Sequence, residues 1–566
     1  MLRQTFEAAM EWVRSLGSGL RNVSATPQSG IAVLEARRCA WRATSGTAML
    51  LVLWLSLMLA MATHHAFWRD EVRALSLATE GANVIEMLRS LHGEGHPALW
   101  YLMLRVGYSV LRNSVILEIL AGCIGTATVL LILYSSPFPM WLRAVFLLNG
   151  VLLFEFSVMA RNYGISACLV FGFAALYYRC REKGAWLGVI LLLLANTNVH
   201  SCILAGCFVA FWLIDILTAQ GFRWTPALRS WALNACVAAL GAVLCFATVY
   251  PPAHDAAALS LGELTFHSVA AAILVPASSF RPLMVWGPFN ALQIQPVPAY
   301  EAATAFKLLS ALMFGSTIGL VRRPGAMLAS VGSMLLLSLF FVCVYPSFYR
   351  HSALWFTFMI SLYWITWNRQ AKEGLLLRTA RAFGLACLVA IAVLQLPVGV
   401  QAFADVVLNR PPASPVRELG AFLRSRPDLR DAVLMSEPNF LIEALPAYAS
   451  NMIYMFRDRR FEPFTSFNRG ASPDVDLQNI LDRAQELQSE TGVPVLVAIQ
   501  KPLDPAQPEQ RWHEGFGWYF VVRPEQVRHF LACTTRVAEF PVSSAVKYNP
   551  DRVDESFDLY MTRRCS

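Results

Sequence analysis

Charge is scarce in this sequence. Asp, Glu, Lys and Arg together make up only 15% of the 566 residues, whereas hydrophobic residues make up 56%. A water-soluble chain of this length needs more charged surface than this, so the composition excludes an ordinary soluble enzyme or binding protein. Repeated apolar runs of about 20 residues predict a polytopic α-helical membrane protein instead.

The chain also lacks the short motifs that mark several large functional classes. It has no Gly-x-Gly-x-x-Gly nucleotide fingerprint, no Gly-Lys-Ser/Thr phosphate loop and no Gly-x-Ser-x-Gly hydrolase motif. No internal repeat indicates a solenoid. The net charge of +8 falls largely in short loops between apolar runs and not in a basic patch interleaved with aromatic residues. It therefore predicts membrane topology, not nucleic-acid binding.

The twelve cysteines show no paired short spacing of the kind that holds a metal ion. Ten of them lie in the N-terminal segment or among the apolar runs, where we interpret them as small core residues. Cys533 and Cys565 alone lie in the hydrophilic C-terminal region. If that region is outside the cytoplasm, a disulfide closing a loop of about 30 residues would contribute about 3–4 kcal/mol, and the sequence leaves this pairing open.

The distribution of arginine predicts the topology. Residues 1–45 carry several arginines before the first apolar run, so we expect a cytoplasmic N-terminal segment and a first span, at about 46–65, that runs outward. No cleavable signal is expected, because this run is too long and too far from the start. The next segment, 66–114, is then an external loop whose amphipathic stretches 70–95 and 97–111 are interfacial helices.

With 97–111 kept outside, the main basic loops all become cytoplasmic, and the chain has eleven spans with its C-terminus outside. The predicted membrane domain covers 46–404. After the first span, its spans are expected at about 115–134, 139–157, 164–178, 185–197, 199–218, 230–250, 302–321, 326–344, 351–367 and 382–403.

The composition becomes soluble-like after Asp405, close to a proline-rich boundary. Two apolar runs, 432–435 and 493–499, read as buried strands, and 477–490 reads as an amphipathic helix. This alternation predicts a small α/β domain over 405–566.

An adjacent acidic pair follows the first span directly, in Phe67-Trp68-Arg69-Asp70-Glu71, and His96-Pro97 comes later in the same expected loop. Neighbouring carboxylates repel each other, and burial raises their pKa unless a cation or metal balances them. The pair is therefore either part of a solvated loop beside interfacial aromatic residues or a catalytic base at the membrane surface.

Most charged residues within or beside the later spans are expected near the same external face: Glu118, Glu155, Arg161, Lys307 and Arg350. With the acidic pair, they predict a cavity open to the outer leaflet. The external loop 251–301, which contains Phe266, Phe280 and Trp286, is expected to act either as a lid on that cavity or as a structural cover.

This arrangement resembles the first external loop of the polyprenyl-phosphate-sugar-dependent glycosyltransferases of the GT-C fold. Over residues 45–400 it is most similar to the protein mannosyltransferase, lipid A aminoarabinose transferase and rhizobial galacturonosyltransferase group. Ala160-Arg161-Asn162-Tyr163 resembles the Arg-x-Tyr opening of that group's second external loop. Tyr349-Arg350-His351 resembles its Arg-Tyr element, with His351 in place of the Tyr, and Asn196-Thr197-Asn198-Val199-His200 resembles its Thr-His segment.

The resemblance implies a membrane glycosyltransferase that moves a sugar from polyprenyl phosphate to an acceptor hydroxyl, with inversion, on the periplasmic face of a bacterial inner membrane. Asp70 is expected to be the general base, and Glu71 to position substrate or contact a metal. The residues expected to bind the lipid phosphate or substrate are Arg161, Tyr163, Arg350, His96, His200 and Lys307. The sugar stays open, as does the acceptor, which could be a glycolipid, a polysaccharide or a protein.

This interpretation requires no cofactor, although Asp70, Glu71 and His96 could together supply ligands to a divalent cation. The first alternative function is a transporter or flippase of an envelope lipid or glycan precursor. Such proteins usually place polar groups at the bilayer midplane in paired repeats, a pattern the sequence does not show. A non-catalytic scaffold whose C-terminal domain binds an envelope partner is the second alternative.

Overall fold

The chain is described here from a computed structural model, which covers residues 30–92, 94–250, 265–280, 299–367, 374–408, 414–466, 471–515, 518–541, 555–563 and 565. It divides into two units, residues 1–52 and 53–566, and the first helix, α2 (Gly30–His64), passes from one to the other. Most of the expected N-terminal segment, Trp286 and the greater part of the expected loop 251–301 lie outside the described residues.

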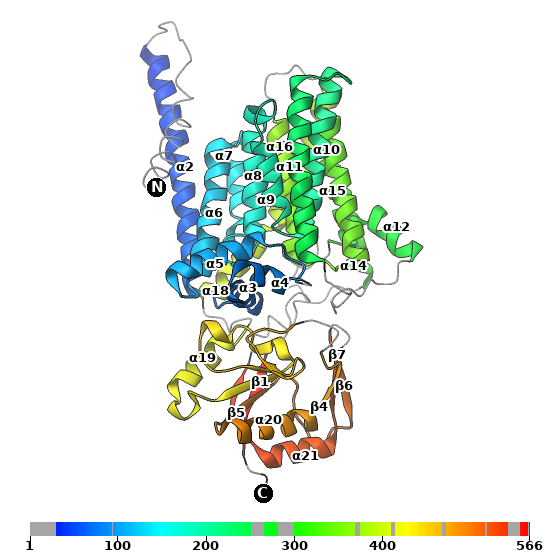
Figure 1. Ribbon diagram of the computed structural model, residues 1–566. Helices are drawn as coiled ribbons and strands as arrows, with labels where there is room; N and C mark the ends of the chain where they lie inside the picture. Colours follow the sequence, from blue (N-terminus) through cyan, green and yellow to red (C-terminus); the bar gives the residue numbers. More distant parts are fainter. Residues whose placement is uncertain are drawn as a thin grey trace. The chain divides into compact units, whose positions relative to one another are not determined.

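Seven helical stretches in the described part of the chain are long and apolar enough to cross a membrane. They are the Ser45–His64 part of α2, α6 (Ile116–Ser135), α8 (Tyr163–Cys180), α10 (Val199–Gln220), α11 (Pro226–Val249), α15 (Pro324–Cys343) and the stretch Leu375–Val407. Figure 1 shows α6, α8, α10, α11 and α15 side by side in a bundle. The predicted class, a polytopic helical membrane protein with a C-terminal α/β domain, is confirmed.

The other expected spans correspond to helices that are shorter, broken or less apolar. They are α7 (Met140–Leu147) with the π-helical turn η1 (Val151–Glu155), α9 (Trp186–Ala195), α14 (Ala299–Ile318) and α16 (Tyr349–Thr366). At 1.5 Å per residue, α9 is only about 15 Å long, half of a bilayer's hydrocarbon core. The last expected span is two helices, α17 (Leu375–Leu394) and α18 (Leu396–Val407), because Pro397 begins a new helix.

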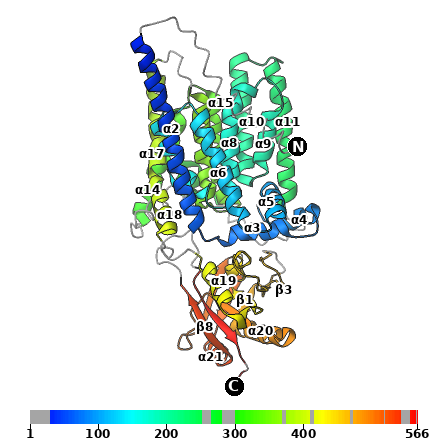
Figure 2. The ribbon, with the colours of Figure 1, turned by 90° about the vertical axis from the view of Figure 1, so that its left-hand side faces the viewer.

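Three helices lie where the sequence predicts the amphipathic helices of an external loop. They are α3 (Arg69–Thr79), α4 (Val84–Ser90) and α5 (Leu99–Leu111). Gly81, at a φ of 70°, turns the chain after α3, and the Asn83 side chain then caps α4 by accepting from two backbone N–H groups. Both views show α3, α4 and α5 at one end of the helix bundle (Figures 1 and 2).

The C-terminal region is an α/β domain that begins with α19 (Val416–Ser425). Its main sheet has the order β1-β5-β9-β8, in which β1 (Val433–Glu437) and β5 (Val495–Ile499) are parallel and wholly buried, as the two apolar runs predicted. The remaining strands of this sheet are β9 (Phe557–Thr562) and β8 (Thr534–Phe540), and the domain's other helices are α20 (Leu477–Thr491) and α21 (Pro524–Cys533). A two-stranded sheet pairs β2 (Tyr454–Met455) with β3 (Arg460–Phe461). A three-stranded sheet has the order β4 (Asp474–Asp476), β7 (Trp518–Val522) and β6 (Gln510–Gly515).

The two faces of the main sheet pack against different partners. Alternate side chains of β1 and β5, such as Val433 and Val495, pack with α20 and α21, whereas Leu434 and Leu496 belong to a core cluster that also contains Val72 of α3. The C-terminal domain and the helices α3, α4 and α5 therefore share one hydrophobic core.

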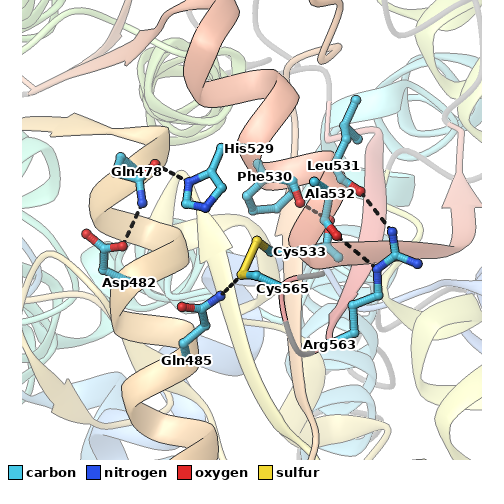
Figure 3. Close-up of a disulfide and its surroundings, with 11 residues drawn as sticks. Gln478, Asp482, Gln485, His529, Phe530, Leu531, Ala532, Cys533, Arg563 and Cys565 are labelled. Atoms are coloured by element: carbon cyan, nitrogen blue, oxygen red, sulfur yellow. Dashed lines mark hydrogen bonds between the residues drawn. A yellow bond between two sulfur atoms is a disulfide. The ribbon is translucent and has the colours of Figure 1, made fainter.

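A disulfide joins Cys533, at the end of α21, to Cys565, beyond β9 (Figure 3). The pairing that the sequence left open is thus present. His529 lies close to both sulfur atoms, but the disulfide uses the thiols that a metal would need, and the His529 ring bonds to Gln478.

Candidate functional site

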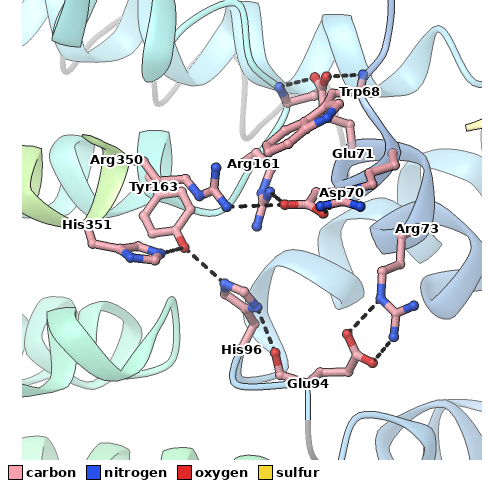
Figure 4. A network of polar contacts seen from close by, with 12 residues as sticks. Trp68, Asp70, Glu71, Arg73, Glu94, His96, Arg161, Tyr163, Arg350 and His351 are labelled. Atoms are coloured by element: carbon pink, nitrogen blue, oxygen red, sulfur yellow. Dashed lines mark hydrogen bonds and ion pairs between the residues drawn. The ribbon is translucent and has the colours of Figure 1, made fainter. Parts of the chain in front are cut away.

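Three guanidinium groups surround the Asp70 carboxylate (Figure 4). Arg161 Nη1 donates to Asp70 Oδ2, Arg350 Nη2 lies 3.2 Å from the same oxygen, and Arg69 Nε lies 3.7 Å from Oδ1. Asp70 is the second residue of α3, Arg161 precedes α8, and Arg350 is the second residue of α16. The chain thus brings together Asp70, Arg161 and Arg350, three of the residues expected to form the site.

The arginines determine the protonation state of Asp70. Burial by itself raises the pKa of this carboxyl, but Arg161, Arg350 and Arg69 outweigh burial and hold the pKa well below its ordinary range. Asp70 is therefore ionised and, while the arginines hold it, a weak base.

Two buried N–H groups beside Asp70 have no acceptor among the described residues: Arg350 Nε and Arg69 Nη1. An unpaired buried donor costs about 1–3 kcal/mol, and more when it belongs to a charged group. A ligand with several acceptor oxygens would satisfy both. Because guanidinium groups bind two oxygens at once, a phosphate group matches this geometry.

The C-terminal domain contributes Glu555 to the same site. Its carboxylate is fully buried, accepts from Trp68 Nε1 at 2.8 Å and lies 3.6 Å from Arg69 Nε. Burial raises the pKa of Glu555, although Arg69 opposes the shift. The second carboxylate oxygen, Oε2, has no partner among the described residues. Sequence reasoning missed Glu555, because no local motif connects it with a site 487 residues away.

Glu71, expected to be catalytic, is directed away from this cluster. Its Oε2 accepts from His65 Nε2 and from the backbone N–H of Trp68, both at 2.8 Å, and its Oε1 accepts from the backbone N–H of Ala160 at 2.6 Å. Neighbouring residues on a helix point about 100° apart, which separates Glu71 from Asp70. Glu71 therefore ties the end of α2 and the first turn of α3 to the loop that carries Arg161.

The suggested metal ligands Asp70, Glu71 and His96 do not converge. Asp70 faces the arginines, whereas the Glu71 carboxylate binds His65 and the backbone N–H groups of Trp68 and Ala160. In the described part of the chain, the ligand atoms of the three residues form no compact group. The arrangement around Asp70 does not fit a divalent cation, because the guanidinium groups already place positive charge there.

His96, Tyr163 and His351 form a hydrogen-bonded chain beside the arginines (Figure 4). His96 Nδ1 lies 3.0 Å from the Glu94 carbonyl, which can only accept, so this nitrogen carries the proton and Nε2 accepts from the Tyr163 hydroxyl at 3.1 Å. Tyr163 must then accept from His351 Nε2 at 2.8 Å, in agreement with His351 Nδ1 accepting from the Phe348 backbone.

The direction of this chain requires neutral imidazoles. Burial, with repulsion from Arg161 and Arg350, lowers the pKa of His96 to about 3, which agrees with that requirement. These hydrogen bonds fix the Tyr163 ring. The ring centroid lies 5.6 Å from Cζ of Arg161 and 5.9 Å from Cζ of Arg350.

The last two expected residues differ in their placement. His200 is buried and stacks on His351 with ring centroids 4.5 Å apart, and neither of its ring nitrogens has a partner among the described residues. Lys307 is exposed on α14, and no hydrogen bond or ion pair in the described ranges joins it to the Asp70 cluster.

An ion-pair clamp fixes α3 beside the site. Arg73 donates to Glu94 through Nε at 3.1 Å and to Glu443 of the C-terminal domain at 2.8 Å. It therefore connects α3 to the segment that precedes His96 and to the domain that carries Glu555. The sequence analysis placed the stretch 70–95 in interfacial helices and assigned Arg73 and Glu94 no role at the site.

No protein-family model matches this chain, and no curated protein matches it. One similar solved structure is the oligosaccharyltransferase of Archaeoglobus fulgidus, crystallised with a tethered acceptor peptide. The similarity covers 80% of this chain and 68% of that one, with 12% sequence identity and a TM-score of 0.33. At these values the likeness by itself assigns no function to this chain.

Proposed function

We propose that this protein is a membrane glycosyltransferase of the GT-C type that takes its sugar from a polyprenyl-phosphate donor. The observation that carries this proposal is the cluster of Arg69, Arg161 and Arg350 around Asp70, with buried N–H groups that lack an acceptor. A phosphate whose lipid tail stays in the bilayer would supply the missing oxygens. The chain has no nucleotide fingerprint, which favours a donor that is already in the membrane.

In the proposed reaction, Asp70 accepts the proton of the acceptor hydroxyl. The oxygen attacks the anomeric carbon, the bond from that carbon to the phosphate oxygen breaks, and polyprenyl phosphate leaves from the opposite face with inversion. A positioned base contributes typically about 10²–10⁴-fold in rate. The arginines stabilise the charge that gathers on the leaving phosphate, which is usually the larger effect in a site of low dielectric.

Donor binding would also activate the base. Asp70 and the donor phosphate compete for the guanidinium groups of Arg161 and Arg350, so an arriving phosphate weakens the pairs that lower the pKa of Asp70. The carboxylate then regains basicity when the donor is in place. In this scheme Glu71, Tyr163 and His96 act as positioning residues.

The C-terminal domain is proposed to complete the acceptor side of the site. Glu555 orients Trp68 and Arg69 beside Asp70, so its carboxylate could accept from an acceptor hydroxyl. We propose that this domain is periplasmic and that the membrane is a bacterial inner membrane. The disulfide between Cys533 and Cys565 supports an oxidising compartment.

The experiment compares cells that lack this chain after complementation with wild type, Asp70→Asn or Asp482→Asn, which alters an exposed carboxylate on α20. Mass spectrometry of envelope glycolipids and glycans should show a sugar addition with wild type and Asp482→Asn and none with Asp70→Asn. Equal amounts of the three proteins in the membrane fraction establish that folding is intact. A sugar addition that survives in Asp70→Asn would refute the proposal.

The transporter alternative expects polar groups near the bilayer midplane. Here Asp70, Arg161 and Arg350 all lie at or next to the first turn of a helix, which favours a site at a membrane surface. Flux of an envelope precursor into vesicles without a lipid-linked sugar would support transport instead.

A further inference from the structure

The C-terminal domain holds the backbone of the short segment that leads from α2 into α3. Arg417 Nη1 of α19 donates to the carbonyl of His64, the last residue of α2, at 3.1 Å. The Tyr448 hydroxyl accepts from the backbone N–H of Phe67, two residues before α3 begins, at 2.6 Å. Both contacts engage main-chain groups, so they fix the path of the segment itself.

Tyr448 is itself fixed within the C-terminal domain. It follows the short helix η7 (Leu445–Ala447), and its carbonyl accepts from Arg424 Nη1 of α19. A Cβ on Gly420 would clash with Tyr448, so glycine at this position allows α19 to approach it closely. The hydroxyl that reaches the segment before α3 is therefore held in place by its own domain.

Phe67 connects this contact to the proposed base. Its side chain is buried, and its ring packs on the Tyr448 ring with centroids 6.1 Å apart. A buried N–H group that loses its acceptor must find another or move. Because Asp70 follows Phe67 by only three residues, in the first turn of α3, a shift of Phe67 would move Asp70 as well.

The pairing of Asp70 depends on its exact position. Arg161 precedes α8 and Arg350 lies in α16, so neither of these arginines moves with α3. A displacement of Asp70 by about 1 Å would lengthen its 3.2 Å contact with Arg350 beyond hydrogen-bond distance. A misplacement of about 1 Å can lower the rate of a reaction by about 100-fold.

We propose that Tyr448 is a positioning residue for the reaction and acts on Asp70 through the backbone of Phe67. This role rests on the proposed glycosyl transfer. Tyr448 holds the start of α3 so that Asp70 stays within reach of the arginines, and Arg417 holds the other end of the same segment. The C-terminal domain thereby assembles the site, in addition to contributing Glu555.

The test compares purified full-length wild type with Tyr448→Phe, which keeps the ring and removes only the hydroxyl. The matched control is Tyr454→Phe, because the Tyr454 hydroxyl accepts from Arg483 Nε of α20 at 3.0 Å and not from the segment before α3. Hydrogen exchange of peptides that cover residues 65–72, measured by mass spectrometry, reports the Phe67 N–H without requiring turnover. Exchange should be about fivefold faster in Tyr448→Phe, the equilibrium factor of one hydrogen bond, and unchanged in the control.

Transfer kinetics measure the consequence for the reaction. In Tyr448→Phe, kcat should fall about five- to tenfold, while KM for the donor changes less than twofold because the arginines are intact. The acid limb of kcat/KM should move to higher pH, since looser pairing with the arginines lowers the pKa of Asp70 less. A merely structural role would lower the unfolding temperature of both variants and leave kcat per folded molecule and the acid limb unchanged.

A second pair of variants keeps the test decisive if Tyr448→Phe does not fold. Arg417 is half-exposed, so Arg417→Met should fold and lose about two- to threefold in kcat, whereas Arg417→Lys, which keeps a donor for the His64 carbonyl, should retain the wild-type rate. Unchanged exchange or unchanged kcat in Tyr448→Phe overturns this role while glycosyl transfer stands, and so does an equal loss of kcat in Tyr454→Phe. If the wild type transfers no sugar, the proposed function fails and this role fails with it.

Discussion

Two aspartates at opposite ends of the helix bundle each pair with arginines. The two sites differ in whether buried N–H groups of those arginines remain without an acceptor among the described residues. Asp70 lies against Arg161, Arg350 and Arg69, whereas Asp215 lies against Arg323 and Arg181 and accepts from Tyr177. At the Asp70 end, two buried guanidinium N–H groups have no acceptor among the described residues.

At the Asp215 end the polar groups pair with one another. Arg323 Nη2 donates to the Tyr178 hydroxyl at 3.2 Å, and that hydroxyl donates to the Ile365 carbonyl at 2.7 Å. No buried polar atom of Asp215, Tyr177 or Arg323 lacks a partner in the described part of the chain. The hydrogen bonds around Asp215 therefore leave no buried polar atom of the network unpaired, among the described residues, whereas those around Asp70 leave two. Only the arginines around Asp70 have unpaired donors that a ligand could satisfy.

The largest effect is expected for Asp70→Asn. The amide cannot accept the acceptor proton, so the rate of sugar transfer should fall by at least about 10²–10⁴-fold. Transfer measured on purified protein, with the thermal unfolding temperature as a control for folding, checks this. A loss of less than tenfold would remove Asp70 from the role of base.

Arg350→Gln should weaken binding of the lipid phosphate. A hydrogen bond between charged partners contributes about 1.5–3 kcal/mol, so affinity for a short polyprenyl monophosphate should fall about 10–100-fold. Calorimetry in detergent measures this, and Arg378→Gln, an exposed arginine at the other end of the bundle, is the matched control. Equal affinities for both variants would show that Arg350 serves only as a partner of Asp70.

The pH dependence of transfer should separate free from donor-bound protein. Asp70 is active when ionised, and activity is lost as the pH falls through its pKa. In the free protein the arginines hold that pKa well below its ordinary range, so the acid limb of kcat/KM should lie below pH 4. With donor bound, phosphate shares the arginines, and the acid limb of kcat should lie at higher pH. Coincident limbs would contradict the proposed competition.

Glu555→Gln should have a smaller effect. The Gln oxygen can still accept from Trp68 Nε1, but the variant loses the negative charge that faces Arg69. We expect KM for the acceptor to rise by about three- to tenfold, the size of one hydrogen bond, with KM for the donor unchanged. Glu539→Gln, an exposed glutamate on β8, is the control. A change in kcat alone would place Glu555 in the chemistry instead of in acceptor positioning.

The sequence predicted the parts of the site that lie next to recognisable elements. Asp70 follows the first apolar run, Arg161 precedes an apolar helix and Arg350 lies in the first turn of another, so the order of the helices alone predicted that the three residues lie at one end of the bundle. Side-chain direction was not predictable in the same way: Asp70 and Glu71 are neighbours, but one faces the arginines and the other holds three chain segments together.

Contacts between residues that are far apart in the sequence could not be predicted either. The contacts of Arg73 with Glu443 and of Trp68 with Glu555 depend on the shared core between α3 to α5 and the C-terminal sheet. Hydrophobic periodicity predicts that each face is buried but does not say against which partner.

The smallest effect on transfer is expected for Asp215→Asn, although its effect on stability should be clear. Removing this charge leaves Arg323 without its carboxylate in a partly buried network, whereas Arg181 keeps its ion pair with Glu182, and we expect a cost of about 1–3 kcal/mol, since partial exposure reduces the penalty of a fully buried pair. The thermal unfolding temperature should fall while the transfer rate per folded molecule stays within twofold. If the transfer rate instead fell as far as in Asp70→Asn, the Asp215 network would be coupled to the reaction, and the distinction between the two sites would fail.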